Sequence, residues 1–430
     1  MKPIQRNLYL NQLIDRKENG LIKIITGLRR CGKSYLLFHI FYNYLLNCGI
    51  KEDHIITLAL DDDKNREYRN PDKLSDFLYS KITDKTEMFY ILLDEVQLII
   101  SDEEQKGKEP IRLYGILNGL LRLDNVDIYI TGSNSKFLSS DILTEFRGRG
   151  DAVRVFPLSF SEFYSASLWK DKYEAFDEYS TYGGLPLLLS KKSDSEKIAY
   201  LKDVLSNTYI KDVVERNHLK GDIVMESLLN ILASSIGSLT NPTKLANTFV
   251  SNHIKTSDVT ISNYISFLMD AFLISKAQRY DIKGKSYINS PFKFYFTDIG
   301  IRNCLLNYRQ QEKTHIMENI IYNELIIRGY NVDVGIIEHV IRSKDGKQQR
   351  IQSEIDFICN RGGERYYIQS AFSIPDEAKM KQETSSFGRI NDSFRKIIVT
   401  QDYGKPWHTE KGYLVINMID FLLNPDCLNL

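Results

Sequence analysis

The sequence predicts an α/β protein that starts with a five-stranded parallel sheet and continues into a helical region and a second α/β region. Two observations predict the first sheet. Short apolar runs rich in β-branched residues recur through the first 160 residues, with helical stretches between them. The first run ends in a glycine-rich segment, and a later run ends in two adjacent carboxylates. Strands that alternate with helices build parallel sheets whose carboxyl ends carry the functional groups.

Composition limits the classes of protein that this chain can be. Its 430 residues suffice for about three domains. Lys+Arg and Asp+Glu both number 56, so no net field favours nucleic acid or acidic lipid. The five cysteines are scattered without a CxxC pair, which predicts reduced thiols in a cytoplasmic protein rather than a zinc site. We find no signal peptide and no apolar segment long enough to span a membrane, so no membrane partner is expected.

The first strand, Leu21 to Thr26, leads into Gly27-x-x-x-x-Gly32-Lys33-Ser34, after which apolar residues recur at helical spacing. Strand, glycine-rich loop and helix are the context of a Walker A phosphate-binding loop. The glycines let backbone N–H groups point at phosphate oxygens, Lys33 adds a cation, and the Ser34 hydroxyl can ligate Mg²⁺. The alternative is a glycine-rich turn that matches by accident. The predicted cofactors are ATP and Mg²⁺, and the predicted nucleotide contacts are Gly27, Leu28, Arg29, Arg30, Cys31, Gly32, Lys33, Ser34 and Tyr35.

A second apolar strand, Tyr90 to Leu93, ends in Asp94-Glu95. A carboxylate at this place beside a phosphate-binding loop can hold Mg²⁺, so Asp94 is predicted to be the Walker B acid. Glu95 is then placed to polarise the attacking water as general base. The alternative is a strand that ends in solvated acids.

Three further strands complete the sheet: about Ile55 to Leu60, Val126 to Thr131 and Ala152 to Pro157. Only one strand lies between the two motifs in the sequence, which predicts that the Val126 strand inserts between their strands in the sheet. Right-handed helical crossovers then make the sheet parallel. The polar end of the Val126 strand faces the γ-phosphate, where Asn134 or Ser133 could orient water.

Several segments identify a family. The Walker motifs, "LLDEVQ", "TGSNS" and "PLSFSEF", with "YGGLP", "YIKDVVERN" and "KFYFTDIGI" further on, resemble a widespread prokaryotic family of AAA+-type P-loop ATPases with a poorly characterised C-terminal region. The resemblance implies ATP hydrolysis. It also implies an arginine finger at Arg147 or Arg149, which would complete a neighbouring subunit's site in a homo-oligomer. The alternative is that both arginines are surface charges or pair with Asp141 and Glu145.

Residues 1–159 are therefore predicted to be the ATPase core and residues 160–222 its helical lid. Residues 223–288 predict a winged helix, with helices at about Thr243–Val250 and Ser257–Phe272 and a hairpin that turns at Lys283-Gly284-Lys285. Only four lysines accompany it, namely Lys244, Lys255, Lys283 and Lys285. DNA and a protein partner both remain possible for this module.

Residues 289–430 resemble the core of PD-(D/E)xK restriction endonucleases. Glu318 or Glu324 on a helix, Asp356 on a strand and Gln369 on the next strand fill three of the four roles of that metal site. The water-activating lysine is missing, because the position two after Gln369 is Ala371; Lys379, Lys381 or Lys396 would have to replace it. The sequence favours a retained fold without nuclease activity over an active nuclease.

The predicted function is a slow, Mg²⁺-dependent ATPase whose nucleotide state controls C-terminal domains that bind DNA or protein. Two alternatives stay open. The first is an ATP-regulated DNA nuclease, and the second is a non-enzymatic nucleotide-dependent switch or scaffold.

Overall fold

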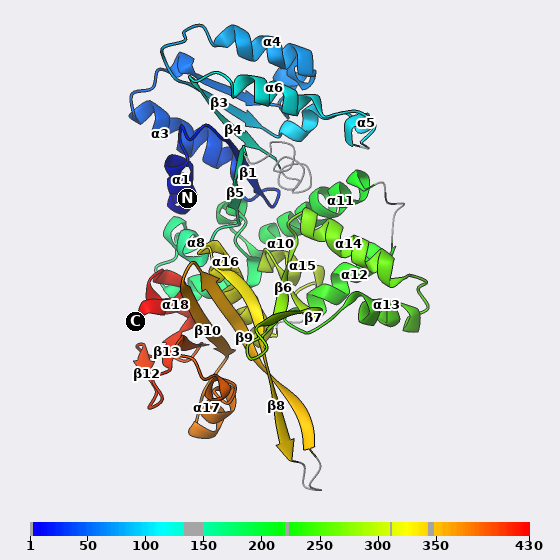
Figure 1. The fold of residues 1–430 in the computed structure, drawn as a ribbon, viewed down its shortest axis with the longest axis vertical. Coiled ribbons are helices and arrows are strands. Elements are labelled where there is room, and N and C mark those ends of the chain that lie inside the picture. Colours follow the sequence, from blue (N-terminus) through cyan, green and yellow to red (C-terminus); the bar gives the residue numbers. More distant parts are fainter. Residues whose placement is uncertain are drawn as a thin grey trace. The chain divides into compact units, whose positions relative to one another are not determined.

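The computed structural model describes residues 3–105, 107–132, 149–217, 219, 223–309, 312–342 and 348–430. The chain divides into two units, residues 3–157 with 270–272 and residues 158–269 with 273–430. We call them the N-terminal and the C-terminal unit and describe each by itself (Figure 1). Among the described residues, no helix is long and apolar enough to cross a membrane.

The N-terminal unit is built on a parallel sheet whose strand order is β2-β3-β4-β1-β5. This order confirms the prediction that the Val126 strand lies between the strands of the two nucleotide motifs. The strands are β1 (Ile22–Gly27), β2 (Ile55–Ala59), β3 (Phe89–Asp94), β4 (Val126–Thr131) and β5 (Gly150–Val155).

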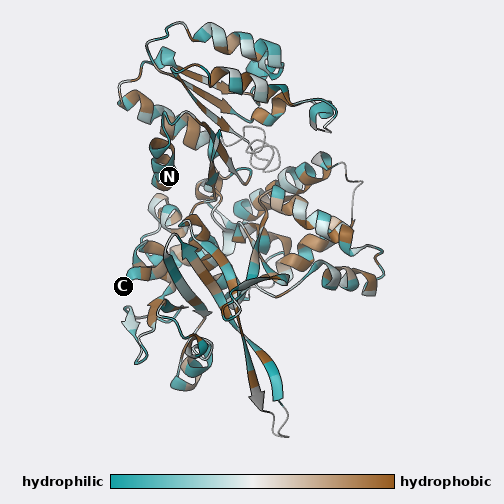
Figure 2. Ribbon diagram, in the orientation of Figure 1, coloured by the Kyte–Doolittle hydropathy of each residue, from teal (hydrophilic) through white to brown (hydrophobic). Residues whose placement is uncertain are grey.

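Helices cover both faces of this sheet. The inward-facing residues of α4 and α6 pack with alternate strand residues into one apolar core, and the strands of this core are visibly apolar in Figure 2. On the other face, the helix after β1 packs Phe41 against Tyr129 at a ring distance of 4.5 Å. That helix is continuous from α2 through a π-helical segment (Leu36–Phe41) into α3. The described helices of the unit are α1 (Asn7–Asp15), α2 (Lys33–Tyr35), α3 (Tyr42–Asn47), α4 (Pro71–Lys81), α5 (Asp102–Gln105) and α6 (Arg112–Leu120), with 3-10 turns at Glu52–His54, Asp63–Arg69 and Val96–Ile99.

The C-terminal unit starts with helices, two of which have side-chain caps at their first turns. Ser159 and Glu162 form a reciprocal capping box at α8, and the side chain of Asn241 caps α13. The described helices are α8 (Phe160–Ala166), α9 (Lys172–Tyr182), α10 (Asp194–Asp203), α11 (Lys211–Arg216), α12 (Ile223–Ser234), α13 (Pro242–Ser251), α14 (Asp258–Asp270), α15 (Ile299–Leu305), α16 (Lys313–Ile327), α17 (Glu377–Glu383) and α18 (Met418–Leu423), with a π-helical segment at Val204–Ile210 and 3-10 turns at Pro186–Ser190, Phe387–Arg389 and Cys427–Asn429.

An eight-stranded sheet in the order β12-β13-β11-β10-β9-β8-β6-β7 completes the unit. In the segment predicted to be a winged helix, the structure has the helices α12, α13 and α14 and an antiparallel β6–β7 hairpin. That hairpin does not stand alone, because β6 pairs in parallel with β8. The boundary expected after residue 288 thus falls within β7, since the long-range β6–β8 pairing carries no local sequence signal. The strands are β6 (Ile274–Asp281), β7 (Ser286–Phe296), β8 (Asn331–Arg342), β9 (Gln348–Arg361), β10 (Glu364–Ala371), β11 (Arg395–Thr400), β12 (Trp407–His408) and β13 (Leu414–Asn417).

Two family segments, "YGGLP" and "KFYFTDIGI", meet at Asp298. Its buried carboxylate caps α15 by accepting the Ile301 N–H at 3.1 Å, and it accepts the Gly184 N–H at 2.8 Å. A Cβ at Gly183 would lie 2.2 Å from Oδ1 of Asp298, so residue 183 has no room for a side chain while this carboxylate keeps its place. These contacts therefore join the end of α9 to the start of α15.

Burial raises the pKa of Asp298 to about 6, although the three backbone N–H groups that it accepts oppose the shift. The pKa of this carboxyl is lower in the unfolded state. Between about pH 4 and 6 the carboxyl of Asp298 is therefore protonated in the folded protein and ionised in the unfolded chain. The free energy of unfolding should therefore fall as pH rises through this window, by roughly 2–3 kcal/mol for this group. Urea unfolding of the wild type and Asp298→Asn at several pH values isolates the effect, because Asn does not ionise. A stability difference that does not change with pH would contradict it.

Candidate functional site

The loop between β1 and α2 has the geometry that a phosphate cradle requires. Gly27 adopts φ 139° and Gly32 adopts φ 100°, both in the region that side chains disfavour. A Cβ at Gly27 would lie only 2.0 Å from the carbonyl oxygen of Val155 on β5. The close approach of β5 and the left-handed turn at Gly32 explain why glycine stands at both positions.

Lys33 is the first residue of the helix and is only 4% exposed. Its ammonium donates hydrogen bonds to the carbonyl oxygens of Gly27 at 3.0 Å and Leu28 at 3.1 Å. The cation is thus held within the loop itself. The same ammonium would compensate the charge of phosphate oxygens bound there.

The acidic side of the site is formed by Asp94 at the end of β3, which is 2% exposed. The Thr131 hydroxyl donates a hydrogen bond to its carboxylate, and the Ser34 hydroxyl lies near enough to lower the pKa of Asp94. Burial raises the pKa of Asp94, the carboxylates of Glu95 and Asp61 raise it further, and the two hydroxyls oppose the shift. Because β4 lies beside both β1 and β3, the fold brings the three side chains together. The sequence alone does not predict this role for Thr131, because its only signal there is its place at the end of a strand.

Glu95 directly follows β3 with φ 54°, a left-handed conformation that is strained for a residue with a side chain. Its N–H donates to the Thr131 hydroxyl at 3.2 Å, and its carboxylate accepts a hydrogen bond from the amide of Gln97. The polypeptide holds Glu95 in this conformation next to the Ser34–Asp94 pair.

This donor set fits a nucleotide with Mg²⁺. A hydroxyl and a carboxylate that lie close to each other are oxygen ligands of the kind that Mg²⁺ accepts. Ser34 and Asp94 would hold the metal, and the loop with Lys33 would hold the phosphates. Bound Mg²⁺ would offset the negative charge that develops on the phosphate oxygens.

The other loop residues that are predicted to contact the nucleotide differ in how far their side chains are exposed to solvent. Leu28 and Cys31 are buried, and the Cys31 thiol donates to the Val155 carbonyl oxygen at 3.4 Å, so these side chains support the loop from behind. The side chains of Arg30 and Tyr35 are exposed and that of Arg29 is half-buried.

Asn134 and Arg147 lie outside the described residues. Arg149 is described; it is exposed, and its guanidinium donates to the Asn118 amide oxygen at 3.5 Å. Its role in a neighbouring subunit stays a prediction.

The four nuclease-like residues are only partly brought together. Glu318 on α16 and Asp356 on β9 both contact Lys293. Glu324 instead forms a buried ion pair at 2.7 Å with Arg328, the residue that follows α16. The Gln369 amide oxygen is buried without a hydrogen-bond partner in the described structure. No group of three His, Cys, Asp or Glu side chains among the described residues is arranged to hold a metal ion.

Comparisons with known proteins cover nearly the whole chain. A family model described as an AAA domain matches residues 19–164, a span that includes all five strands of the first sheet. A second family model, described as a domain of unknown function (DUF8612), matches residues 173–312.

Two relatives match nearly the whole of this chain. A Haemophilus influenzae protein described as an uncharacterized protein is 33% identical over 426 residues, 98% of each chain. The Methanocaldococcus jannaschii uncharacterized protein MJ1544 is 29% identical over 94% of this chain and 86% of its own length. Among solved structures, the Walker-type ATPase PABY2304 of Pyrococcus abyssi matches with a TM-score of 0.47 and 14% identity, covering 71% of this chain and 98% of that one.

Proposed function

We propose that this chain, which belongs to the same protein family as the Haemophilus influenzae relative and carries an AAA domain, is a slow Mg²⁺-dependent ATPase whose nucleotide state controls its C-terminal unit. ATP would bind at the loop of residues 27–34. The C-terminal unit would bind DNA or a protein partner in one nucleotide state and release it in the other.

The observation that carries this proposal is the buried Asp94 carboxylate. Burial raises the pKa of this carboxylate, and the Ser34 hydroxyl at the end of a glycine-rich loop lies close enough to lower it. The two side chains come from the helix after β1 and from the end of β3, residues far apart in the sequence. An accidental glycine-rich turn would not require a buried carboxylate at this place, because burying a carboxylate is costly unless it serves a partner. The AAA-domain match over the same residues supports the same assignment.

Within this proposal Lys33 neutralises phosphate charge, and Ser34 with Asp94 holds the metal. Glu95 takes a proton from the attacking water, since its backbone and carboxylate are both fixed by hydrogen bonds beside Asp94. Asn134 would orient that water, and Arg147 or Arg149 of a neighbouring copy would stabilise charge in the transition state.

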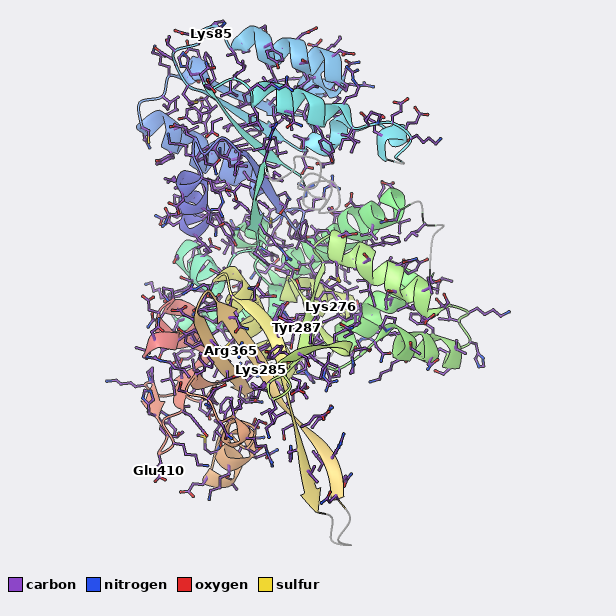
Figure 3. All side chains as sticks on the ribbon, viewed as in Figure 1. Lys85, Lys276, Lys285, Tyr287, Arg365 and Glu410 are labelled. Carbon is purple, nitrogen blue, oxygen red and sulfur yellow. The ribbon has the colours of Figure 1, made fainter. Side chains whose placement is uncertain are left out.

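Because the chain has no net charge, only local groups of charged residues can indicate which partner the C-terminal unit binds. The winged-helix segment carries Lys244 at the start of α13 and Lys283 and Lys285 at the β6–β7 turn, where Lys285 lies close to Tyr287 (Figure 3). A few phosphate contacts of this kind give weak, salt-sensitive DNA binding. A protein partner would use the same face without that salt dependence.

Steady-state turnover of ATP by the full chain, with Mg²⁺ and with EDTA, tests the proposed enzyme. We expect slow hydrolysis with Mg²⁺ and none with EDTA. A single round of hydrolysis followed by retained ADP would favour the non-enzymatic switch. The absence of both turnover and a single round would contradict an ATPase.

A further inference from the structure

Lys293 on β7 lies in the middle of the nuclease-like site. Its ammonium is 2.9 Å from Oε1 of Glu318, 2.7 Å from Oε1 of Glu354 and 3.9 Å from Oδ1 of Asp356. The residue is only 3% exposed. The three carboxylates come from α16 and β9, so one lysine joins a helix and two strands.

The endonuclease resemblance implies a different arrangement, in which the carboxylates hold a divalent metal and a lysine two residues after Gln369 activates water. Residue 371 is alanine; it is 2% exposed and packs in an apolar cluster with Tyr367 and Phe387. No cation comes from that strand position. The cation of this site is instead Lys293 on β7, a strand that is not part of the endonuclease motif.

Two of the carboxylate oxygen atoms that a metal would need already accept hydrogen bonds. Oε1 of Glu318 accepts both the Lys293 ammonium and the Tyr295 hydroxyl, the latter at 2.6 Å. Oδ2 of Asp356 accepts the Ser370 N–H at 2.8 Å. A divalent ion at this place would have to displace the ammonium, because two cations among the same buried carboxylates repel strongly.

The charges in the cluster fit one resident ammonium. Burial raises the pKa of Asp356, repulsion from Glu318 raises it further, and the Lys293 ammonium opposes the shift. The pKa of Lys293 itself is raised, since its three carboxylates outweigh the effect of burial. The lysine thus stays charged, and with one of the three carboxyls protonated the cluster has a net charge of −1.

We propose that Lys293 is the permanent cation of this site, so that the C-terminal unit keeps the endonuclease-like carboxylates as a metal-free structural centre. The residues do not fit the divalent metal that the resemblance implies. The ammonium does the structural work of that ion by joining α16, β7 and β9. This inference is independent of the proposed ATPase activity.

Thermal unfolding of the full chain, in EDTA and in millimolar Mn²⁺, tests the proposal with three proteins. They are the wild type, Lys293→Met and the matched control Lys276→Met. Lys276 is on the neighbouring strand β6, and its ammonium lies over the ring of Phe292 on β7 (Figure 3). Lys293→Met leaves three carboxylates without their cation. We expect the Tm of Lys293→Met to be several degrees below that of the wild type in EDTA and to recover partly with Mn²⁺. The difference in Tm between the wild type and Lys276→Met should be the same in EDTA and in Mn²⁺.

A Lys293→Met protein that folds and does not respond to Mn²⁺ would overturn the proposal. If that variant does not fold, calorimetric titration of Mn²⁺ into the wild type and Asp356→Asn decides instead. Equal heats for these two proteins support a site closed to metals. Binding by the wild type that Asp356→Asn loses would overturn it, as would plasmid nicking that depends on Asp356.

Discussion

Lys33→Ala is expected to lower the rate of ATP turnover by roughly 10²- to 10³-fold, the loss typical for removal of one charge-stabilising donor from a transition state. The ammonium is 4% exposed and held by two carbonyl oxygens of the loop, so its position is set before any nucleotide binds. Alanine keeps the helix but removes the cation. Turnover measured at saturating ATP separates this loss from weaker binding.

The matched control is Lys85→Ala, an exposed lysine of the same unit (Figure 3). It changes the net charge equally and leaves the loop intact, so its rate should equal that of the wild type. Circular dichroism confirms that both variants fold. Equal rates for Lys33→Ala and the wild type would contradict the assignment of the loop.

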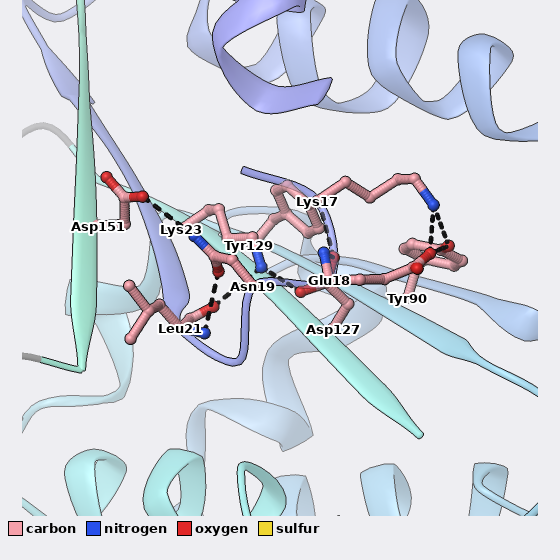
Figure 4. A network of polar contacts seen from close by, with 9 residues as sticks. All are labelled: Lys17, Glu18, Asn19, Leu21, Lys23, Tyr90, Asp127, Tyr129 and Asp151. Carbon is pink, nitrogen blue, oxygen red and sulfur yellow. Dashed lines mark hydrogen bonds and ion pairs between the residues drawn. The ribbon is translucent and has the colours of Figure 1, made fainter. Parts of the chain in front are cut away.

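Lys23→Ala should destabilise the N-terminal unit by about 3–5 kcal/mol, because it leaves a buried carboxylate without its cation. Lys23 and Asp127 form an ion pair at the start of β1 and β4, with side chains that are 0% and 2% exposed (Figure 4). Asp127 also accepts the Tyr129 hydroxyl at 2.8 Å and the Glu18 N–H at 2.9 Å. These two bonds remain in the variant, but neither supplies a positive charge.

Urea unfolding followed by hydrogen exchange in peptides of β1 and β4 reports this unit directly. Lys51→Ala is the control, since the Lys51–Glu87 pair is also a direct ion pair, at 2.9 Å, but its side chains are 63% and 42% exposed. Its loss should change the free energy of unfolding little, because solvent screens the exposed pair. Lys23→Met combined with Asp127→Asn should recover much of the lost stability, because no buried charge is then unpaired. Equal effects for Lys23→Ala and Lys51→Ala would contradict this account.

The sequence predicted those parts of the fold that depend on neighbouring residues or on chain connectivity. The loop, its helix and the acidic strand end are local signals, and the sheet order followed from having one strand between the two motifs. The structure confirms the five-stranded parallel sheet and the place of β4.

Features that depend on residues distant in the sequence could not be predicted in this way. Thr131 joins the site only because β4 lies next to β3, and Lys293 meets Asp356 through contacts between different strands. Glu324 and Glu318 look equivalent on one helix, yet they are six residues apart and lie in different surroundings. Periodicity places both glutamates on α16 but does not say which partner each one meets.

We propose that the nucleotide at the loop of residues 27–34 controls residues 158–430. Hydrogen exchange of the full chain with a non-hydrolysable ATP analogue and with ADP, each with Mg²⁺, tests it most directly. We predict protection of the loop and of β3 with both nucleotides, and exchange rates in residues 158–430 that differ between the two. Protection of the loop with identical exchange throughout residues 158–430 would contradict the claim.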